Sequence, residues 1–176
     1  MEELLILVDE NDKQIGVMEK MEAHEKGVLH RAFSVFIFNS KNQLLLQQRA
    51  DEKYHSPGLW SNTCCSHPLN GETVDNAVKR RLIEELGLNA DATFKFSFIY
   101  RHEFQNGLTE HELDHVYFGV SDDVPHPNPL EVKDWKYIKL KDLKEELERN
   151  PENYSAWLRI CFPKIEEHFQ QQFSSQ

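Results

Sequence analysis

The sequence predicts a layered domain of the α/β or α+β class, in which helices flank a mixed sheet. Strand-sized apolar runs recur along the first 140 residues and are separated by short polar segments. Few segments show helical periodicity: the clearest is 73–86, and two more lie near the end of the chain. Strands mixed with a few helices are typical of a sheet covered by helices.

Length and composition predict one globular domain. The chain has 176 residues, of which 39% are hydrophobic and 28% charged, and a single domain over residues 1–176 is expected. No apolar run approaches the ~18 residues that a membrane span needs. The opening Met-Glu-Glu lacks the basic residues of a signal or transit peptide. We therefore expect a cytoplasmic protein without membrane contact.

Charge and cysteine content narrow the possible functions. A formal net charge of −10 argues against broad binding to nucleic acid or an anionic membrane. An anionic substrate would need a local cluster of Lys and Arg, or a metal. Cys64 and Cys65 are adjacent and Cys161 is distant, so no paired disulfide framework can be drawn. An odd number of cysteines fits a reducing compartment, where a cysteine packs or reacts.

Alternating and continuous apolar runs place the strands. The expected strands are 4–8, 14–18, 32–38, 43–48, 60–67, 93–104, 111–120 and 135–140. Polar turns at 10–13, 40–42 and 105–107 join three pairs of them. Residues 20–30 are charged and are expected to form a loop or a short helix.

The clearest helix runs from Thr73 to Leu86. Thr73 is a suitable N-cap, and Gly87 is well placed to end the helix. Further helices are expected at about 141–149 and 154–173, with Pro163 interrupting the second.

The segment from Ser61 to Pro68 contains a possible reactive group. In an extended segment residues two apart share a side, so Cys65 and His67 face one cavity while Cys64 and Ser66 face away. An imidazole that binds a metal beside a thiol is a workable catalytic arrangement, because nearby positive charge lowers the pKa of a thiol. Taken alone, the segment is better explained by packed cysteines and a loop histidine.

Two carboxylates, Glu110 and Glu112, share one side of an expected strand by the same argument. Neighbouring carboxylates repel one another unless a cation or a shared proton lies between them. His24 and His30 add imidazoles from a polar connecting segment, and such a nitrogen–oxygen set suits Mn, Fe, Co or Zn, and Mg less well. A solvated acidic strand end is the alternative, and spacing alone does not bring these residues together.

The predicted helix resembles the Nudix pattern. Residues at the expected spacing are Glu72, Arg80, Glu84, Glu85 and Gly87. Ser66 replaces the first glycine of the pattern, and Arg81 stands where a Nudix hydrolase has a glutamate that binds metal. A solvent-exposed face of salt bridges would give similar charges. The pattern still predicts a Nudix-type fold, but the missing glutamate at position 81 weakens the prediction of hydrolase activity.

Together these segments resemble the metal-dependent isopentenyl-diphosphate isomerases, over nearly the whole chain. The motifs that carry the resemblance are Leu7–Asp12, His24, Leu29–Ser34, Gln48–Ala50, Pro57–Trp60, Asn62–Leu69, Glu110-x-Glu112, Asn128–Glu131 and Tyr154–Trp157. The resemblance implies a Nudix-type mixed sheet flanked by helices, with N-terminal and C-terminal additions. It also implies conversion of isopentenyl diphosphate to dimethylallyl diphosphate, a 1,3 proton shift in isoprenoid synthesis.

The resemblance also implies roles for particular residues. Cys65 and Glu112 work on opposite faces of the isoprenoid, Tyr100 hydrogen-bonds near Glu112, and Trp157 covers the hydrocarbon. The residues implied to bind metal are His24, His30, His67, Glu110 and Glu112 for Mn²⁺, Mg²⁺ or Zn²⁺, and Glu85 for a Mg²⁺ that bridges to the diphosphate. The implied diphosphate ligands are Lys20, Arg49 and Lys53. The partner is then a small diphosphate, not nucleic acid or membrane, and the protein is a monomer or weak homodimer.

Two rival functions remain open on the residues. A Nudix pyrophosphohydrolase would need a glutamate at position 81 and has no use for Cys65. A metal-binding or thiol-sensing protein would use the cysteines and histidines without turnover, but it leaves the pattern from Glu72 to Gly87 unexplained. The remaining histidines, at positions 55, 102, 111, 115, 126 and 168, are expected to be surface or packing residues.

Overall fold

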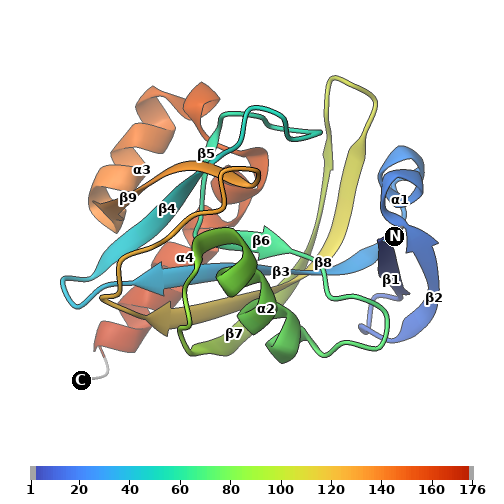
Figure 1. Ribbon diagram of the computed structural model, residues 1–176, viewed down its shortest axis with the longest axis horizontal. Coiled ribbons are helices and arrows are strands. Elements are labelled where there is room, and N and C mark those ends of the chain that lie inside the picture. The colour runs from blue at the N-terminus through green and yellow to red at the C-terminus, as the bar shows by residue number, and fades with distance from the viewer. Residues whose placement is uncertain (1–2, 175–176) are drawn as a thin grey trace.

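The computed structural model describes residues 3–174, and side chains through residue 172. Its nine strands form one mixed sheet (Figure 1). They are β1 (Leu4–Val8), β2 (Gln14–Glu19), β3 (His30–Phe38), β4 (Gln43–Arg49), β5 (Trp60–Ser61), β6 (Cys64–Ser66), β7 (Ala92–Glu103), β8 (Thr109–Val120) and β9 (Val132–Lys139). The helices are α1 (Lys20–Lys26), α2 (Val74–Leu86), α3 (Leu140–Arg149) and α4 (Ala156–Ser174), with a 3₁₀ turn at Pro151–Asn153.

Strand β3 organises the sheet. It pairs in parallel with β8 along its whole length, from His30 opposite Glu112 to Phe38 opposite Val120. It pairs antiparallel with β1, β4 and β6, while β7 and β8 form a long hairpin and β9 pairs with β4. Side chains of β3 alternate between the two faces of the sheet, which is why the two faces build separate cores.

Each face of the sheet is covered by helices (Figure 1). On one face, Phe33, Val35 and Ile37 of β3 belong to a buried cluster with residues of α2 such as Leu82 and Leu86. On the other face, Phe36 and Phe38 belong to a cluster with residues of α3 and α4, among them Leu143, Leu158 and Ile165. The predicted α/β arrangement of a mixed sheet flanked by helices is therefore confirmed.

The expected elements are present with shifts of a few residues at their ends. The charged segment 20–30 contains a true helix, α1, and the extended segment 60–67 divides into the short strands β5 and β6. The prediction that Pro163 interrupts the last helix is wrong, since α4 continues through it. Cys161, Phe162 and Ile165 on either side of Pro163 are buried. Their packing holds the helical path despite the backbone hydrogen bond that proline removes.

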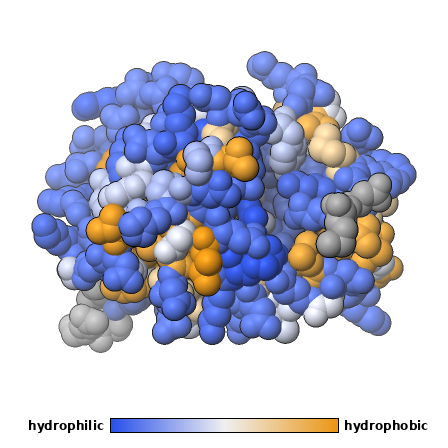
Figure 2. All heavy atoms as spheres, viewed as in Figure 1, coloured by the Kyte–Doolittle hydropathy of each residue, from blue (hydrophilic) through white to orange (hydrophobic). Residues whose placement is uncertain are grey.

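Among residues 3–174, no helix is both long and apolar enough to cross a membrane. The face seen in Figure 2 is mostly hydrophilic, with hydrophobic residues in small separate groups.

The end of α2 depends on a glycine. Gly87 has a φ of 61° and its N–H donates to Ile83 O, and a Cβ there would lie 2.9 Å from the backbone oxygen of His126. Gly71 has a φ of 86° with open space around it, so it is a matched control. We expect Gly71→Ala to cost about 1–2 kcal/mol of unfolding free energy through its φ alone. Gly87→Ala should cost more because of the added clash. Urea unfolding of both variants checks this, and equal losses would contradict the role of the clash.

Candidate active site

The strand pairing brings chemically active side chains to one end of the β3–β8 pair. Glu112 of β8 lies between His30 of β3 and Tyr100 of β7, and Cys65 of β6 lies opposite Ser34 of β3. Directly paired residues on neighbouring strands project from the same face of a sheet. This register therefore gathers a histidine, a carboxylate, a phenol and a thiol on one face.

A pocket opens over these residues. The predicted site residues that line it are Lys20, Arg49, Lys53, Cys65, His67, Glu85, Tyr100, Glu110, Glu112 and Trp157. His24 and His30 are wholly buried next to His67, with ring centroids 5.9 and 5.0 Å from its ring. The structure thus brings together residues from helices and strands along most of the chain.

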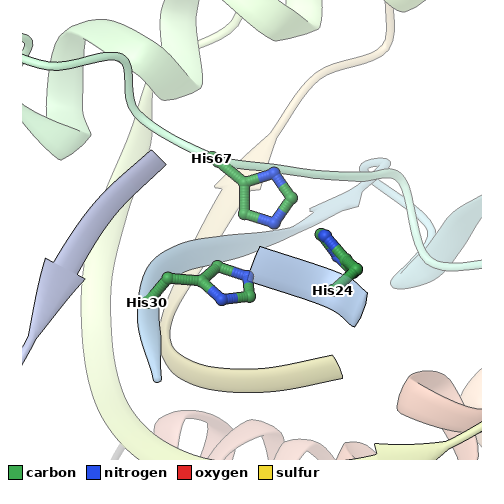
Figure 3. A group of neighbouring side chains, drawn as sticks. All are labelled: His24, His30 and His67. Atoms are coloured by element: carbon green, nitrogen blue, oxygen red, sulfur yellow. The ribbon is translucent and has the colours of Figure 1, made fainter. Parts of the chain in front are cut away.

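Three histidines form the most concentrated group of ligand atoms. His24 comes from α1, His30 is the first residue of β3, and His67 follows β6. One ring nitrogen from each lies within 4.8 Å of the others. Figure 3 shows the three imidazoles facing one another, with ring nitrogens turned toward the space between them.

Hydrogen bonds fix which nitrogen of these rings is free. His24 Nδ1 lies 2.7 Å from the backbone oxygen of Lys20, and His30 Nδ1 lies 2.9 Å from that of Val28. A carbonyl only accepts, so each Nδ1 carries the hydrogen and each Nε2 keeps its lone pair. The Nε2 atoms of His24, His30 and His67 are buried without a hydrogen-bond partner in the described part of the chain. A divalent cation would satisfy all three, and metal-binding histidines are typically oriented this way.

The protonation states suit a cation. Burial lowers the pKa of His24 below its ordinary value, and burial lowers the pKa of His30 and His67 much further. All three rings are therefore neutral at neutral pH, which is the form that binds a metal. These residues could hold a divalent ion.

Two buried carboxylates adjoin the histidines. Glu110 and Glu112 are each 5% exposed, and His67 Nε2 lies 3.9 Å from Glu112 Oε1. Burial raises the pKa of Glu112 to about 7, and burial together with the neighbouring Glu112 raises the pKa of Glu110. Tyr100 hydrogen-bonds to Glu112, and burial raises the pKa of its phenol. Such a pair needs a shared proton or a cation, as the sequence suggested.

Cys65 lines the same pocket, and polar neighbours orient its thiol. Its Sγ donates to Asn62 Oδ1 at 3.0 Å and lies 3.4 Å from Ser34 Oγ. The same Asn62 oxygen accepts the indole N–H of Trp157 at 3.1 Å. Burial raises the pKa of the Cys65 thiol above its ordinary value. One fully buried amide thus orients both the thiol and the tryptophan.

The alternation predicted along β6 holds for its cysteines. Cys65 lines the pocket, whereas Cys64 is fully buried in the core beneath α2 and donates to Glu85 Oε2 at 2.8 Å. Ser66 was expected to face away, but it also lines the pocket. The strand ends at Ser66, so the strict alternation of a pleated strand ends there too.

Cations surround the mouth of the pocket. Lys53 pairs with Glu131, and Lys20 Nζ lies 3.4 Å from Glu3 and 4.7 Å from the ring of Tyr54. The Arg49 guanidinium donates to the backbone oxygen of His55 and lies 5.1 Å from the Trp157 ring. In a chain of net charge −10, this is the local positive cluster that an anionic substrate requires.

The comparison with known proteins gives the family. Residues 28–158 match the model of the NUDIX domain. An isopentenyl-diphosphate Delta-isomerase of Pectobacterium atrosepticum is 56% identical over 166 residues, which cover 94% of this chain and 93% of that protein. The chain belongs to the isopentenyl-diphosphate Delta-isomerase family. Another such isomerase, from Aliivibrio fischeri, is 44% identical and covers 97% of this chain and 99% of its own length.

Solved structures agree on the fold. A crystal structure from Deinococcus radiodurans has a TM-score of 0.77 at 24% identity, covering 92% of this chain and 98% of that one. A MutT protein from Methanosarcina mazei has a TM-score of 0.65 at 15% identity, covering 80% of this chain and 94% of its own. At these identities the likeness shows that this isomerase family shares the Nudix fold.

The helix α2 shows how this member of the isomerase family departs from the Nudix pattern. Arg81, in place of the glutamate, lines the pocket and donates to Glu85 Oε1 at 3.0 Å. It also lies 3.5 Å from Glu131. A positive group therefore stands where the hydrolase pattern places a carboxylate.

Three residues of the pocket region were missed by reasoning from the sequence. Tyr54 and His55 line the pocket, and Asn62 anchors Cys65 and Trp157. His55 was expected to be a surface or packing residue. Tyr54 and His55 lie in an irregular loop. A loop has no helix or strand period, so the sequence pattern could not predict which of its side chains are buried. Asn62 stands within a recognised motif, but nothing in the sequence showed what its amide contacts.

Proposed function

We propose that this chain converts isopentenyl diphosphate to dimethylallyl diphosphate by moving a proton within the allylic system. The observation that carries the proposal is one pocket in which Cys65, Glu112 and Tyr100 lie beside a cluster of cations. Membership of the isopentenyl-diphosphate Delta-isomerase family supports the same reaction. The substrate is then a small diphosphate.

A divalent cation would be held by His24, His30 and His67 with Glu110 and Glu112. The orphaned Nε2 atoms and the adjacent buried carboxylates support this set. When bound, the ion would offset the charge of the two carboxylates and strengthen the acidity of a group attached to it. Mn²⁺, Zn²⁺ and Mg²⁺ are the candidate ions, and the nitrogen-rich set favours the first two.

The diphosphate end of the substrate would lie against Lys20, Arg49 and Lys53. All three line the pocket, and Lys20 and Lys53 can exchange their present carboxylate partners for phosphate oxygens. Glu85, buried on α2, would help to hold a Mg²⁺, which would supply positive charge to offset that of the diphosphate. The anion would thereby be fixed with its hydrocarbon tail toward the interior.

The alkene is a very poor base, so it needs a well-placed acid. Glu112, hydrogen-bonded to Tyr100, would give a proton to the terminal alkene carbon as a tertiary carbocation develops. Tyr100 stays a neutral phenol in this buried position, and its hydrogen bond can stabilise the Glu112 carboxylate once the proton has left. The acid side of the reaction is assigned to these two residues.

Cys65 would complete the shift by taking a proton from C2, which forms the new double bond and discharges the cation. The thiol must act as thiolate. Burial raises its pKa, so positive charge brought close to it, such as that of a bound divalent cation, would be needed to favour that form. Trp157 is 3% exposed and presents its ring to the pocket, where it can stabilise the cation and exclude water.

A hydrolase of the same fold is the rival function. It would cleave the diphosphate, whereas the present proposal leaves both phosphates in place. Isopentenyl diphosphate incubated with the protein and Mn²⁺ or Mg²⁺ should give an allylic diphosphate, which ionises in dilute acid while the substrate does not. Acid-labile product without phosphate release is the expected result. Release of phosphate or pyrophosphate before the acid step would contradict it.

Asn62 is predicted to be a positioning residue. Asn62→Ala removes the common anchor of Cys65 and Trp157, and a small displacement of reacting groups can cost about 10²-fold in rate. We expect kcat to fall with little change in KM. Ser61→Ala is the control, because Ser61 Oγ donates to the same amide oxygen, while its other hydrogen-bond partner is Ser155 and not the thiol or the indole. Equal losses of kcat in both variants, measured well below their unfolding temperatures, would contradict this role.

A further inference from the structure

His55 adds a fourth imidazole beside the three predicted ligands. It lies in the loop between β4 and β5, and its ring centroid is 6.3 Å from that of His24. One ligand atom from each of His24, His55 and Glu110 lies within 4.8 Å of the others. This second group shares His24 with the first and replaces His30 and His67 with a nitrogen and an oxygen donor.

His55 and Glu110 face each other without a hydrogen bond, since His55 Nε2 lies 3.7 Å from Glu110 Oε2. His55 and Glu110 are each 5% exposed, and His55 Nδ1 and Glu110 Oε1 are buried with no hydrogen bond in the described part of the chain. His24 Nε2 is likewise unpaired. Leaving a buried polar atom unsatisfied costs about 1–3 kcal/mol, so several such atoms in one place indicate an absent ligand.

The spacing and chemistry of the group suit a divalent first-row metal. Bonds of about 2.0–2.2 Å from nitrogen and carboxylate oxygen place opposite ligands about 4 Å apart around one ion, within the observed limit. Two imidazoles with one carboxylate favour ions from Mn²⁺ to Zn²⁺ over Mg²⁺ or Ca²⁺. His24 Nδ1 is held by Lys20 O, so only its Nε2 is free and it binds one ion at a time.

Packing explains the contacts that the His55 ring makes, but it does not explain the surroundings of its ring nitrogens. The ring stacks on Phe104 with centroids 4.8 Å apart and meets the edge of Trp157 at 5.5 Å. A phenylalanine would make both contacts. Packing does not account for the unpaired Nδ1, nor for the second ring nitrogen, Nε2, which lies 3.7 Å from Glu110 Oε2 and too far from it for a hydrogen bond.

We propose that His55 is a metal ligand, which with His24 and Glu110 forms a second cation position adjoining the position of His24, His30 and His67. The two positions compete for His24 and for Glu110, which the metal centre of the proposed function also uses. A first-row divalent ion therefore occupies either the position with His30 and His67 or the position with His55. When His30 or His67 is removed, the position with His55 can still bind the ion. The proposal builds on the metal centre of the proposed function, but it concerns binding and needs no turnover.

Titration with Co²⁺, followed by its visible absorption and by equilibrium dialysis, tests the proposal. In a His67→Ala background, the cation should still bind through His24, His55 and Glu110. Adding His55→Phe, which keeps the aromatic contacts, should weaken this residual binding at least about 10-fold. Adding His102→Phe instead should leave it unchanged, because His102 also packs against Phe104 but is in neither ligand group. Equal affinity of the His67→Ala and His67→Ala/His55→Phe proteins would overturn the proposal.

A second measurement uses the otherwise unaltered protein. With ¹⁵N-labelled histidine, a His55 ring-nitrogen resonance, identified by its absence in His55→Phe, should shift when Zn²⁺ is added. A His55 resonance that is unchanged at saturating Zn²⁺, while those of His30 and His67 shift, would overturn the proposal even if the His67→Ala proteins cannot be purified.

Discussion

Replacing Cys65 with alanine is expected to abolish isomerisation while the protein stays folded and keeps its metal. The substitution removes the group assigned to take the proton from C2, and a positioned acid or base contributes about 10²–10⁴-fold to a rate. Cys65 is half-buried at the pocket and lies outside the histidine cluster, so cation binding should not change. Turnover of isopentenyl diphosphate and metal content after dialysis are the two measurements.

The cysteine variant has a matched control in the same chain. Cys161→Ala removes a thiol of α4 that is buried in the core and does not line the pocket, so activity should persist with a modest loss of stability. Cys65→Ala with undiminished turnover would remove Cys65 from the mechanism. Phosphate release that survives Cys65→Ala would point to the Nudix hydrolase instead.

Replacing His67 with alanine is expected to weaken divalent-metal binding strongly and to remove most activity. Even residues behind metal ligands typically contribute 10–100-fold to affinity, so loss of a direct ligand should cost at least about 10²-fold. His67 Nε2 is an unpaired buried nitrogen that faces His24 and His30. Metal content by mass spectrometry and a Mn²⁺ titration give the effect.

His126→Ala is the control for the loss of a histidine, because His126 is exposed and belongs to neither group of ligand atoms. It should keep both metal and activity. High concentrations of Mn²⁺ should partly restore turnover in His67→Ala if His67 acts through the ion. Full activity of His67→Ala after removal of metal would rule out a catalytic role for the histidine cluster.

Local patterns predicted a large part of this fold. Thr73 caps α2 with a hydrogen bond to Asn76 N, and Gly87 ends the helix in the left-handed conformation, as their residue types indicated. Strand alternation predicted that Cys65 faces a cavity and Cys64 faces away from it, and the two thiols lie so. These properties depend on a few neighbouring residues, so the sequence is sufficient to predict them.

The meeting of distant segments could not be read from local patterns. His24, His30 and His67 come together because α1, β3 and the end of β6 are brought to one place by the sheet pairing, and only the family resemblance predicted that. His55 was missed because its loop has neither strand nor helix period. The break at Pro163 was predicted because proline lacks a backbone N–H. The buried neighbours of Pro163 in α4 keep the chain helical there.

The central claim is a proton shift within an intact diphosphate, and NMR in D₂O tests it most directly. The purified, reduced protein would be incubated with isopentenyl diphosphate and Mg²⁺ or Mn²⁺, with carbon-bound deuterium and phosphorus followed together. We predict dimethylallyl diphosphate that carries deuterium, with no release of phosphate or pyrophosphate. Unchanged substrate with fully metal-loaded protein, or release of phosphate in place of isomerisation, would contradict the claim.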